Sequence, residues 1–502
     1  MISLFPLFLI SLSAWGSSVN AQAKNYPGAA GWPTSAAWQE LGQATGGRLS
    51  KCPATECTSS QGAYVLAAKT AQDVSAGMKF ATANKVRVSV KGTGHDFMSS
   101  QNRNGGSGSL LIYTRTMKGY QIVPEWVATG APNGTAPQAA VGIAGGTAFE
   151  EVYPFVERER LMIVHGATAS VGAAGGWIQG GGHGPLSNQY GMGCDNALEF
   201  EIVVPSGAIL IANDYQNQDL FFALRGGGGG TFGIVTRLIT RAYPLPTMNG
   251  IQISVRGRGY LDAMAYLFAM TPNMTDFGLS GYPTMSGSSY SSRLRAPGKT
   301  AQEISEFFNP IAERMRQLGV TVSLDQVVDR GTTSKRELFK EAAESEKLKA
   351  RQLGGLMTSR LLARDALNEG NIPAIRKMLS SVTGGLSSVL PYPNAGGRVA
   401  QNRDLDTGLN PAWRDAVMHM IVMGIGGSPV SAMDPLSANH GAYLNEASPS
   451  ERDWKTTFFG GGEHYARLLE VKKKYDPTNT LWCTPCVGGD LLVERSGRLY
   501  DA

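Results

Sequence analysis

A glycine-rich stretch between residues 161 and 207 constrains the fold of this chain more than any other part of its sequence. The glycines surround Trp177, Gln179 and His183, and they are too dense for a packed helix or the interior of a regular strand. Because glycine has no Cβ, backbone N–H groups in such a run can lie close to a flat or charged ligand. The stretch therefore predicts a main-chain cradle for a large cofactor. The alternative interpretation is a glycine-rich surface loop.

The length and composition indicate a soluble globular protein with at least two domains. The chain has 502 residues, which is more than one compact core usually contains. Hydrophobic residues make up 42% of the chain and charged residues 17%, and the formal net charge is only +5. So small a charge on so long a chain favours neither nucleic acid nor an anionic membrane as a partner, and we expect neither.

Residues 1–23 are expected to be a secretory signal peptide, which predicts an extracellular protein. An apolar run from Ile2 to Trp15 precedes small and polar residues, and residues 21–23 match the small-x-small pattern before a cleavage site. A membrane anchor is the alternative, but the run is shorter than the roughly 20 residues that a spanning helix needs. Secretion would make two sequons candidate glycosylation sites, at Asn133 and Asn273.

The five cysteines would meet an oxidising environment in a secreted protein, so we consider them as possible disulfides. Cys52 and Cys57 lie close in sequence, and Cys483 and Cys486 form a CxxC, so each pair could close a small ring. Cys194 is then left over, and we expect a buried, unreactive thiol. A thioredoxin-type site is not expected at the CxxC because no strand–helix redox unit surrounds it.

Apolar periodicity and capping residues predict several elements in the first half of the chain. Thr70 and Asp73 predict the start of a helix after an N-terminal arm, residues 24–58. Alternation from residue 86 to residue 90 predicts a half-buried strand that leads into KGTGHDF. Thr147 with Glu150 predicts a capping box that opens another helix.

The later part of the chain has a different character. Residues 246–430 have fewer glycines, and we expect them to form a second domain in which residues 314–362 are largely helical. Near the C-terminus, apolar residues around Leu468 lie on one face of a helix that Asp476-Pro477 ends. The lysines at 472–474 are expected to be the solvated face of that helix.

Three common catalytic patterns are absent or incomplete. Gly228, Gly230 and Gly233 form a G-x-G-x-x-G, but a helical pattern precedes it and a strand follows, which is the reverse of a dinucleotide-binding Rossmann site. No GxSxG elbow of a serine hydrolase is present. The six histidines show neither i, i+4 pairing nor an acid or cysteine at ligand spacing, so no metal site is expected.

Six blocks of sequence, in order along the chain, carry a family resemblance. They are VKGTGHDF (90–97), SVGAAGGWIQGGGHGPLSNQYG (170–191), DNALEFEIVVPSG (195–207), DLFFALRGGGGGTFGIVT (219–236), AYLNEASP (442–449) and YARLLEVKKKYDP (465–477). Together they resemble the berberine-bridge-enzyme-like flavin oxidoreductases of the vanillyl-alcohol-oxidase superfamily, especially the secreted fungal members.

The resemblance implies an α+β fold with two domains. One is a two-part FAD-binding domain of the para-cresol-methylhydroxylase type, made from residues 59–245 and a C-terminal segment, residues 431–502, that returns to it and to the active site. The other is a substrate domain, residues 246–430, with a broad antiparallel sheet backed by helices.

The resemblance also implies FAD held covalently through one residue. His95 would be joined to the flavin 8α-methyl, and the alternative is a loop histidine that only forms hydrogen bonds. Many relatives have a cysteine that makes a second link, but the aligned residue here is Thr168. Relatives often have an arginine after GHD[FY], whereas Met98-Ser99-Ser100 follows here, so backbone donors are expected to compensate. The other residues implied at the cofactor are Lys91, Gly92, Thr93, Gly94, Asp96, Ser170, Val171, Gly172, Gly175, Gly176, Gln179, Gly182, His183, Gly233, Ile234 and Val235.

The implied reaction is oxidation of a small organic alcohol, amine or sugar by a monomer, with hydride transfer to flavin N5 and O2 as the electron acceptor. Tyr443 is the candidate base and Asn445 and His440 are weaker candidates, whereas His183 is assigned to the cradle. A phenol with a pKa of about 10 acts as a base only if its surroundings lower that pKa, and the alternative is a buried structural tyrosine. The rival function is a non-redox isomerase or cyclase, or a metabolite-binding protein, on the same scaffold.

Overall fold

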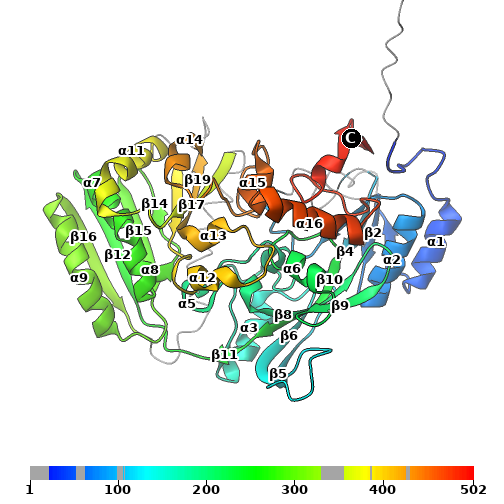
Figure 1. The fold of residues 1–502 in the computed structure, drawn as a ribbon, viewed down its shortest axis with the longest axis horizontal. Helices are drawn as coiled ribbons and strands as arrows, with labels where there is room; N and C mark the ends of the chain where they lie inside the picture. The colour runs from blue at the N-terminus through cyan, green and yellow to red at the C-terminus, as the bar shows by residue number, and fades with distance from the viewer. Residues whose placement is uncertain are drawn as a thin grey trace, which may run out of the picture.

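The computed structural model describes residues 22–52, 63–98, 106, 108–329, 356–384, 387–424 and 430–502. Most of the expected signal peptide lies outside the described residues, and so do Cys57, Ser99 and Ser100. Two lobes lie side by side, and the C-terminal segment returns to the first of them (Figure 1). Within the ranges given above, none of the helices combines the length and hydropathy needed to cross a bilayer.

The first lobe begins with a four-stranded sheet in which three strands run parallel. Its order is β1 (Leu49–Lys51), β2 (Tyr64–Ala67), β4 (Leu110–Tyr113) and β3 (Val88–Lys91). Helix α2 (Ala71–Ala83) covers the sheet with Val74, Met78 and Ala81, which are fully buried in a core shared with the strands. The predicted periodicity of this helix is confirmed.

The start of α2 confirms the predicted cap. Thr70 Oγ1 accepts a hydrogen bond from the Asp73 N–H, and Asp73 Oδ2 accepts one from the Thr70 N–H, at 3.1 Å each. The preceding residues, expected to form only an arm, contain helix α1 (Ser35–Ala44). Trp38 of α1 stacks on Tyr64 with ring centroids 3.8 Å apart, so this part of the chain belongs to the core of the lobe.

Strand β3 differs from the expected half-buried pattern because both of its faces are covered. Arg87 and Ser89, predicted to face solvent, are 2% and 3% exposed. Arg87 donates to the Trp482 carbonyl, and the Val88 N–H donates to the Thr480 carbonyl. The C-terminal segment therefore covers an edge strand that local sequence predicted to be open on one side.

An antiparallel five-stranded sheet completes the first lobe. Its order is β5 (Tyr120–Trp126), β6 (Gln138–Ala144), β10 (Ile234–Arg241), β8 (Ala197–Val203) and β9 (Ile209–Asn213). Two further pieces support it, the small sheet of β7 (Leu161–Met162) with β11 (Tyr243–Pro244), and helix α6 (Gln218–Leu224). The order helix α6, five glycines, strand β10 agrees with the argument against a Rossmann site.

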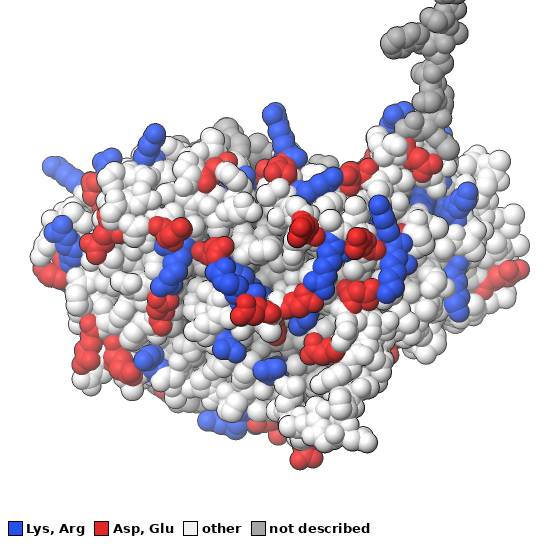
Figure 2. Space-filling view, viewed as in Figure 1, with Lys and Arg blue, Asp and Glu red and all other residues white. Residues whose placement is uncertain are grey.

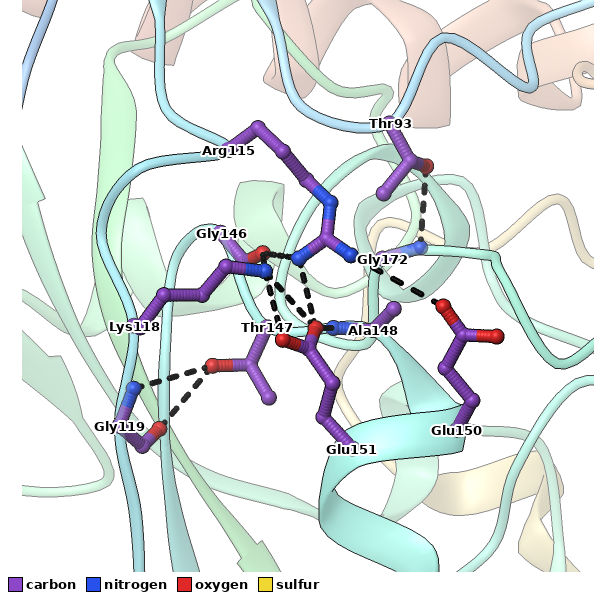
Figure 3. Close-up of polar contacts among 10 residues, drawn as sticks. All are labelled: Thr93, Arg115, Lys118, Gly119, Gly146, Thr147, Ala148, Glu150, Glu151 and Gly172. Carbon is purple, nitrogen blue, oxygen red and sulfur yellow. Dashed lines mark hydrogen bonds and ion pairs between the residues drawn. The ribbon is translucent and has the colours of Figure 1, made fainter.

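Helix α3 (Phe149–Arg158) begins one residue later than predicted. At the start of the helix, the Ala148 N–H donates to the Glu151 carboxylate at 2.7 Å. The prediction had assigned this role to Glu150. The Thr147 hydroxyl instead forms two hydrogen bonds with the backbone of Gly119 (Figure 3). The capping-box prediction is therefore wrong in register, because the backbone of Gly119, just before β5, binds the hydroxyl that was expected to cap the helix.

The second lobe contains a large antiparallel sheet. The order is β16 (Val320–Val327), β12 (Gly250–Gly257), β15 (Ser289–Arg295), β14 (Thr284–Met285), β18 (Ser388–Tyr392), β19 (Ala416–Gly424) and β17 (Leu356–Ala363), with β13 (Ser280–Gly281) paired to β15. Helices α7 (Tyr260–Ala269), α9 (Ala301–Gln317) and α11 (Ile372–Val382) share one hydrophobic core with it (Figure 1). The expected broad sheet backed by helices is confirmed.

Alternation along β19 divides its side chains between two faces. Met420 and Val422 belong to the core under the helices, whereas Ile421 lies in a separate cluster on the opposite face. His419 is on that opposite face too, and it pairs across the sheet with Tyr392 of β18. The second lobe therefore presents a row of polar and aromatic side chains away from its helices.

The charged stretch expected to be largely helical, residues 314–362, is helical only at its start, where residues 314–317 end α9, and the rest of its described part contains strands. After α9, residues 320–327 form β16 and residues 356–363 form β17, and the residues between 330 and 355 lie outside the described ranges. The charges of β16 are accommodated because it is an edge strand of the sheet. Shorter helices in this half of the chain are α8 (Thr271–Phe277), α12 (Gly397–Gln401), α13 (Ala412–Asp415) and α14 (Val430–Met433).

The C-terminal segment forms α15 (Trp454–Phe459), α16 (Gly462–Tyr475) and the hairpin of β20 (Leu492–Arg495) and β21 (Arg498–Asp501). Helix α16 packs on α6 of the first lobe and ends before Asp476 as predicted. Lys472, expected on the solvated face, is instead 2% exposed, and its Nζ lies 2.6 Å from Asp476 Oδ2. That prediction is wrong because Asp476, itself buried, supplies the charge that lets the ammonium leave water.

Two cysteine predictions can be compared with the structure. Cys483 and Cys486 form a disulfide, as expected. Cys194 is buried and free, and burial raises the pKa of its thiol, which agrees with an unreactive cysteine. Cys52 is disulfide-bonded, but the expected pairing with Cys57 lies outside the described residues.

Basic and acidic side chains alternate on the face shown in Figure 2. Exposed ion pairs such as Arg403–Asp415 and Lys474–Asp219, each 2.6 Å between nitrogen and oxygen, bring the two signs together. The charges on this face are therefore mixed and do not form a field of one sign.

Candidate active site

One cavity lies where the glycine-rich segments of the first lobe meet the large sheet and the C-terminal segment. Residues 92–97, which follow β3, and parts of residues 166–183 line it, together with Gly229, Gly230 and residues 233–235. The second lobe contributes Tyr282 and Tyr392. The C-terminal segment contributes Tyr443, Asn445 and Glu446.

The glycines keep part of this cavity open. A Cβ added at Gly175 or Gly176 would meet no atom within 4 Å, so these two positions leave space that any other residue would fill. Gly182 has a φ of +72°, and a Cβ there would lie 2.9 Å from the Trp177 ring. The Trp177 indole N–H donates to the His183 carbonyl at 3.1 Å and so holds the turn after α4 (Gly176–Gln179).

His95 lies in the cavity wall on the loop after β3. Its Nε2 is 2.9 Å from Ser170 Oγ, which orients the ring from the opposite glycine-rich segment. The same two segments are joined by the Gly172 N–H, which donates to Thr93 Oγ1 at 3.1 Å (Figure 3). The histidine expected to hold the cofactor is therefore placed between two loops that hydrogen bonds fix to each other.

A charged network joins the two sheets of the first lobe next to the cavity (Figure 3). Arg115 Nη1 lies 2.6 Å from Glu151 Oε2 and donates to the Gly146 carbonyl at 2.6 Å. Lys118 Nζ lies 2.8 Å from the same carboxylate. Thr114 and Gly145, neighbours of this network in sequence, line the cavity, so the network fixes the position of that part of the wall.

Most of the residues expected at the cofactor line this one cavity. They are Gly92, Thr93, Gly94, His95, Asp96, Thr168, Val171, Gly172, Gly175, Gly176, Gln179, His183, Gly233, Ile234 and Val235. Three others do not line it: Lys91 ends strand β3, Ser170 supports His95, and Gly182 lies beneath the Trp177 ring. His440 also lies outside the cavity, 3.4 Å from Asp434 and largely exposed.

Five side chains of different origin form what we call the polar wall of the cavity, namely His183, Tyr282, Tyr392, Tyr443 and Glu446. The Tyr443 ring lies 4.9 Å from the His183 ring, and Asn445 Nδ2 donates to the Tyr443 hydroxyl at 2.9 Å. Tyr282 and Tyr392 contact each other with centroids 4.6 Å apart. Sequence reasoning missed both of these tyrosines because no motif separates them from ordinary core residues.

Burial sets the protonation state of the phenols in this wall. It is the main cause that raises the pKa of Tyr443 and of Tyr282 well above the ordinary value, and the nearby Glu446 carboxylate raises both further. Both hydroxyls therefore stay protonated near neutral pH. Burial thus opposes a role of Tyr443 as a base, which would need a lowered pKa.

Two residues of the polar wall, His183 and Glu446, form a cluster with His419 that histidine spacing did not predict. Nitrogen or oxygen atoms of His183, His419 and Glu446 all lie within 4.8 Å of one another. The residues come from three distant segments, so no local spacing could have revealed them. The signals that existed were a lone histidine in the apolar strand β19 and the acid in AYLNEASP.

The cavity fits FAD on the observations above. The open space at Gly175 and Gly176 suits a flat ring system, and the glycine-rich loops present backbone next to it. His95 lies at the same wall.

Comparison with known proteins agrees with this assignment. A model of the FAD binding domain matches residues 62–213, and one described as berberine and berberine like matches residues 442–487. The FAD-linked oxidoreductase apf9 of Gibberella fujikuroi is 31% identical over 474 residues, which cover 86% of this chain and 80% of the relative. The VAO-type flavoprotein oxidase VAO615 of Thermothelomyces thermophilus is 29% identical over 462 residues, covering 88% and 78%.

Solved structures share the fold over almost the whole chain. The VAO-type flavoprotein MtVAO713 from Myceliophthora thermophila C1 superposes with a TM-score of 0.84 at 25% identity, covering 96% of this chain and all of that one. Berberine bridge enzyme from Eschscholzia californica has a TM-score of 0.68 at 15% identity, covering 88% and 97%. The chain therefore belongs to the berberine-bridge-enzyme-like FAD-linked oxidoreductases of the vanillyl-alcohol-oxidase superfamily, and FAD is its cofactor.

Proposed function

We propose that the protein is a secreted flavoprotein oxidase that oxidises a small organic alcohol, amine or sugar. Bound FAD supplies the acceptor for the substrate hydride and passes the electrons to O2, which gives hydrogen peroxide. The observation that carries the proposal is one cavity with His95 in its wall and a polar wall formed by both lobes. A relative named as an oxidase, at 29% identity, supports O2 as the acceptor.

His95 is proposed as the single covalent attachment of FAD. Ser170 holds its ring in the cavity wall, which favours a defined approach to the flavin edge. Thr168 lines the cavity where many relatives have a second, cysteine link, and a hydroxyl does not form that bond. Residues 59–245 and 431–502 are proposed as the FAD-binding domain, and residues 246–430 as the substrate domain.

Tyr443 and Asn445 are proposed as substrate-positioning groups. Asn445 Nδ2 bridges the Tyr443 hydroxyl and the Gly176 carbonyl, at 2.9 and 3.0 Å, so the amide links the C-terminal segment to the glycine cradle. Because burial keeps Tyr443 protonated, its hydroxyl can donate a hydrogen bond to a substrate oxygen or nitrogen. This orients the C–H bond that reacts and assigns Tyr443 the role of donor in place of base.

Secretion and glycosylation complete the proposal. Asn133 is exposed in the turn between β5 and β6, where an attached glycan would project into solvent. Asn273 is exposed on helix α8, but Thr275 of its sequon is 1% exposed and donates to the Pro272 carbonyl. The exposed turn is thus the better acceptor site of the two.

The proposal is tested with His95→Ala and a matched control, His440→Ala, which alters a histidine outside the cavity. After acid precipitation, we expect flavin in the pellet for the wild type and the control but in the supernatant for His95→Ala. Anaerobic substrate should bleach the flavin absorbance, and air should restore it with release of peroxide. Flavin that remains covalently bound in His95→Ala would contradict the attachment.

The rival function is a non-redox catalyst or binding protein on the same scaffold. A substrate screen coupled to peroxide detection separates the two, because an isomerase or cyclase would turn over substrate under nitrogen without net reduction of the flavin. Turnover that needs no oxygen, with flavin oxidised throughout, would favour the rival.

A further inference from the structure

Three side chains of ligand type converge at the polar wall from three parts of the chain. His183 follows the glycine-rich helix α4, His419 lies on strand β19, and Glu446 lies in the C-terminal segment. The His183 and His419 side chains are 6% and 0% exposed, and that of Glu446 is 14% exposed. Two imidazoles and a carboxylate in one protected place form a recurring metal-ligand set.

The distances within this cluster fit ligands that share one ion, although the shorter of them is also a hydrogen-bond distance. Glu446 Oε2 lies 3.1 Å from His183 Nε2 and 3.7 Å from His419 Nδ1. In a charge-assisted N–H···O hydrogen bond the nitrogen and oxygen are typically about 2.7–2.9 Å apart. Two ligands of one tetrahedral zinc ion, with bonds of about 2.0–2.1 Å, lie roughly 3.3–3.4 Å apart, between the two observed values.

A second group orients the His183 ring. Its Nδ1 lies 2.8 Å from Asn394 Nδ2 and 3.2 Å from the Tyr282 hydroxyl. Asn394 is fully buried, and its Oδ1 has no hydrogen-bond partner among the described residues. Rotating the Asn394 amide by a half-turn exchanges Oδ1 and Nδ2, which are of nearly equal size. The Asn394 Oδ1 can then accept a hydrogen bond from the Nδ1–H of His183. His183 then presents the lone pair of Nε2 toward Glu446, which is how an outer hydrogen bond prepares a ligating histidine.

We propose that His183, His419 and Glu446 bind one divalent transition-metal ion of the zinc type. Three protein ligands leave a fourth coordination position open. Since His183 and Glu446 line the cavity, that position faces it. It would take a hydroxyl or carbonyl oxygen of the molecule that occupies the cavity. This last step rests on the proposed function, whereas the ion site itself does not.

The test measures zinc in the flavin-loaded enzyme. The protein is incubated with zinc sulfate and desalted, and zinc is then counted against flavin absorbance. We expect about one zinc ion per flavin in the wild type and a loss of roughly tenfold or more in Glu446→Gln and His419→Gln. His440→Gln, an exposed histidine near Asp434, is the matched control and should retain the ion.

A milder variant covers the case in which a ligand variant does not fold. Asn394→Leu keeps all three ligands but removes the outer hydrogen bond, so zinc should bind about 10- to 100-fold more weakly while the flavin content stays unchanged. Wild-type enzyme that is yellow but takes up no zinc would overturn the site. So would zinc that is retained by the Glu446 and His419 variants.

The outcome is separable from that of the oxidase proposal. Zinc that binds with this dependence on Glu446, in an enzyme that releases no peroxide, supports the ion site and contradicts the oxidase. Peroxide release by an enzyme that takes up no zinc after incubation supports the oxidase and overturns the ion site.

Discussion

Gly176 is the residue at which a single substitution should separate folding from cofactor binding. A side chain there would point into open cavity, because no protein atom lies within 4 Å of an added Cβ. We expect Gly176→Val to fold normally but to lose most of its flavin, since the valine occupies space that the cofactor needs. The ratio of flavin absorbance to protein absorbance measures the loss.

The control for this change is Gly384→Ala. Gly384 is exposed, and an added Cβ there also meets no atom within 4 Å, but it lies outside the cavity. Full flavin content in Gly176→Val, equal to that of Gly384→Ala, would show that the open space at Gly176 is not cofactor space.

Asp73 should make part of the stability of the first lobe depend on pH. Burial opposes its ionisation, but hydrogen bonds from Arg48 and from the N–H groups of Lys69 and Thr70 outweigh that cost, so its pKa lies below the ordinary 3.8. A carboxyl with a lower pKa in the folded than in the unfolded state stabilises the fold above the unfolded value. The contribution disappears as pH falls through the folded value.

We therefore expect Asp73→Asn to lower the free energy of unfolding by about 1–2 kcal/mol at neutral pH, the scale of a lost helix cap. The difference from the wild type should shrink as the pH falls below the ordinary 3.8. Urea titrations at a series of pH values measure it. A difference that stays constant down to pH values well below 3.8 would show that the ionised carboxylate is not responsible.

Single residues of the cavity were predictable from sequence where glycines and histidines belong to motifs. The glycine-rich residues were predicted because a cradle needs residues without a Cβ, and His95 was predicted because the family resemblance implied it. The structure brings most of these residues into one cavity. Tyr282 and His419 were missed because their neighbours in sequence are ordinary strand residues, and their role depends on which face of a sheet they occupy. Tyr443 was found, but its raised pKa is set by burial, which local sequence does not determine.

Helix α16 is attached to the first lobe by a buried charge, which gives a prediction at the scale of an element. Lys472 Nζ donates to the Thr231 and Leu481 carbonyls, at 2.9 and 2.7 Å, and pairs with Asp476. Lys472→Met would leave the Asp476 carboxylate buried without its ammonium, so we expect unfolding to be easier by about 3–5 kcal/mol. Lys473→Met, next to it but exposed, should change little.

Hydrogen exchange gives a second measure of this attachment. The N–H groups of Thr480 and Leu481 donate to Asp476, so both should exchange faster in Lys472→Met than in Lys473→Met. Adding Asp476→Asn to Lys472→Met should recover part of the lost stability because it removes the unpaired charge. Equal exchange rates in the two single variants would show that Lys472 does not hold the helix.

Elements were predictable from sequence where their surroundings are local. The start of α2 needed only Thr70 and Asp73, and the structure confirms it. One face of strand β3 was assigned to solvent because the C-terminal segment that covers it is hundreds of residues away. Lys472 was assigned to solvent because its contact with Thr231 of the first lobe forms only when the chain folds back. An amphipathic pattern shows which face of an element is polar, but it does not show whether that face is exposed. A polar face can be buried when an ion pair forms within the protein.

The contact between the lobes gives a prediction for the whole molecule. Arg414 of α13 forms a two-pronged ion pair with Asp195 of the first lobe, at 2.8 and 2.9 Å, and the two side chains are 5% and 1% exposed. We expect Arg414→Met to lower the midpoint of thermal unfolding, because a buried charge without its partner costs about 3–5 kcal/mol.

Arg403→Met is the matched control for this contact, because Arg403 pairs with Asp415 at the surface, where both side chains are more than half exposed. An exposed pair contributes at most about 1 kcal/mol. Midpoints that fall equally in the two variants would mean that the buried pair does not hold the lobes together.

The architecture of the whole molecule was predictable only through the resemblance. Periodicity gave separate helices and strands, but it could not show that a large sheet faces the glycine cradle or that the last segment closes the cavity. Those relations depend on contacts between Gly176 and Asn445, or His183 and Glu446, which lie more than 250 positions apart. The α+β fold itself is confirmed by the solved structures of the family.

The assembly of this cavity from both ends of the chain also decides when the enzyme can acquire its cofactor. His95 leaves the ribosome early, but roughly 350 more residues must follow before Tyr443 is made, which takes about 20–70 s at 5–20 residues per second. Until then the glycine loops lack the segment that closes them. We therefore expect the flavin to be acquired only after residue 443 has been made, and a protein truncated before that residue to accumulate colourless.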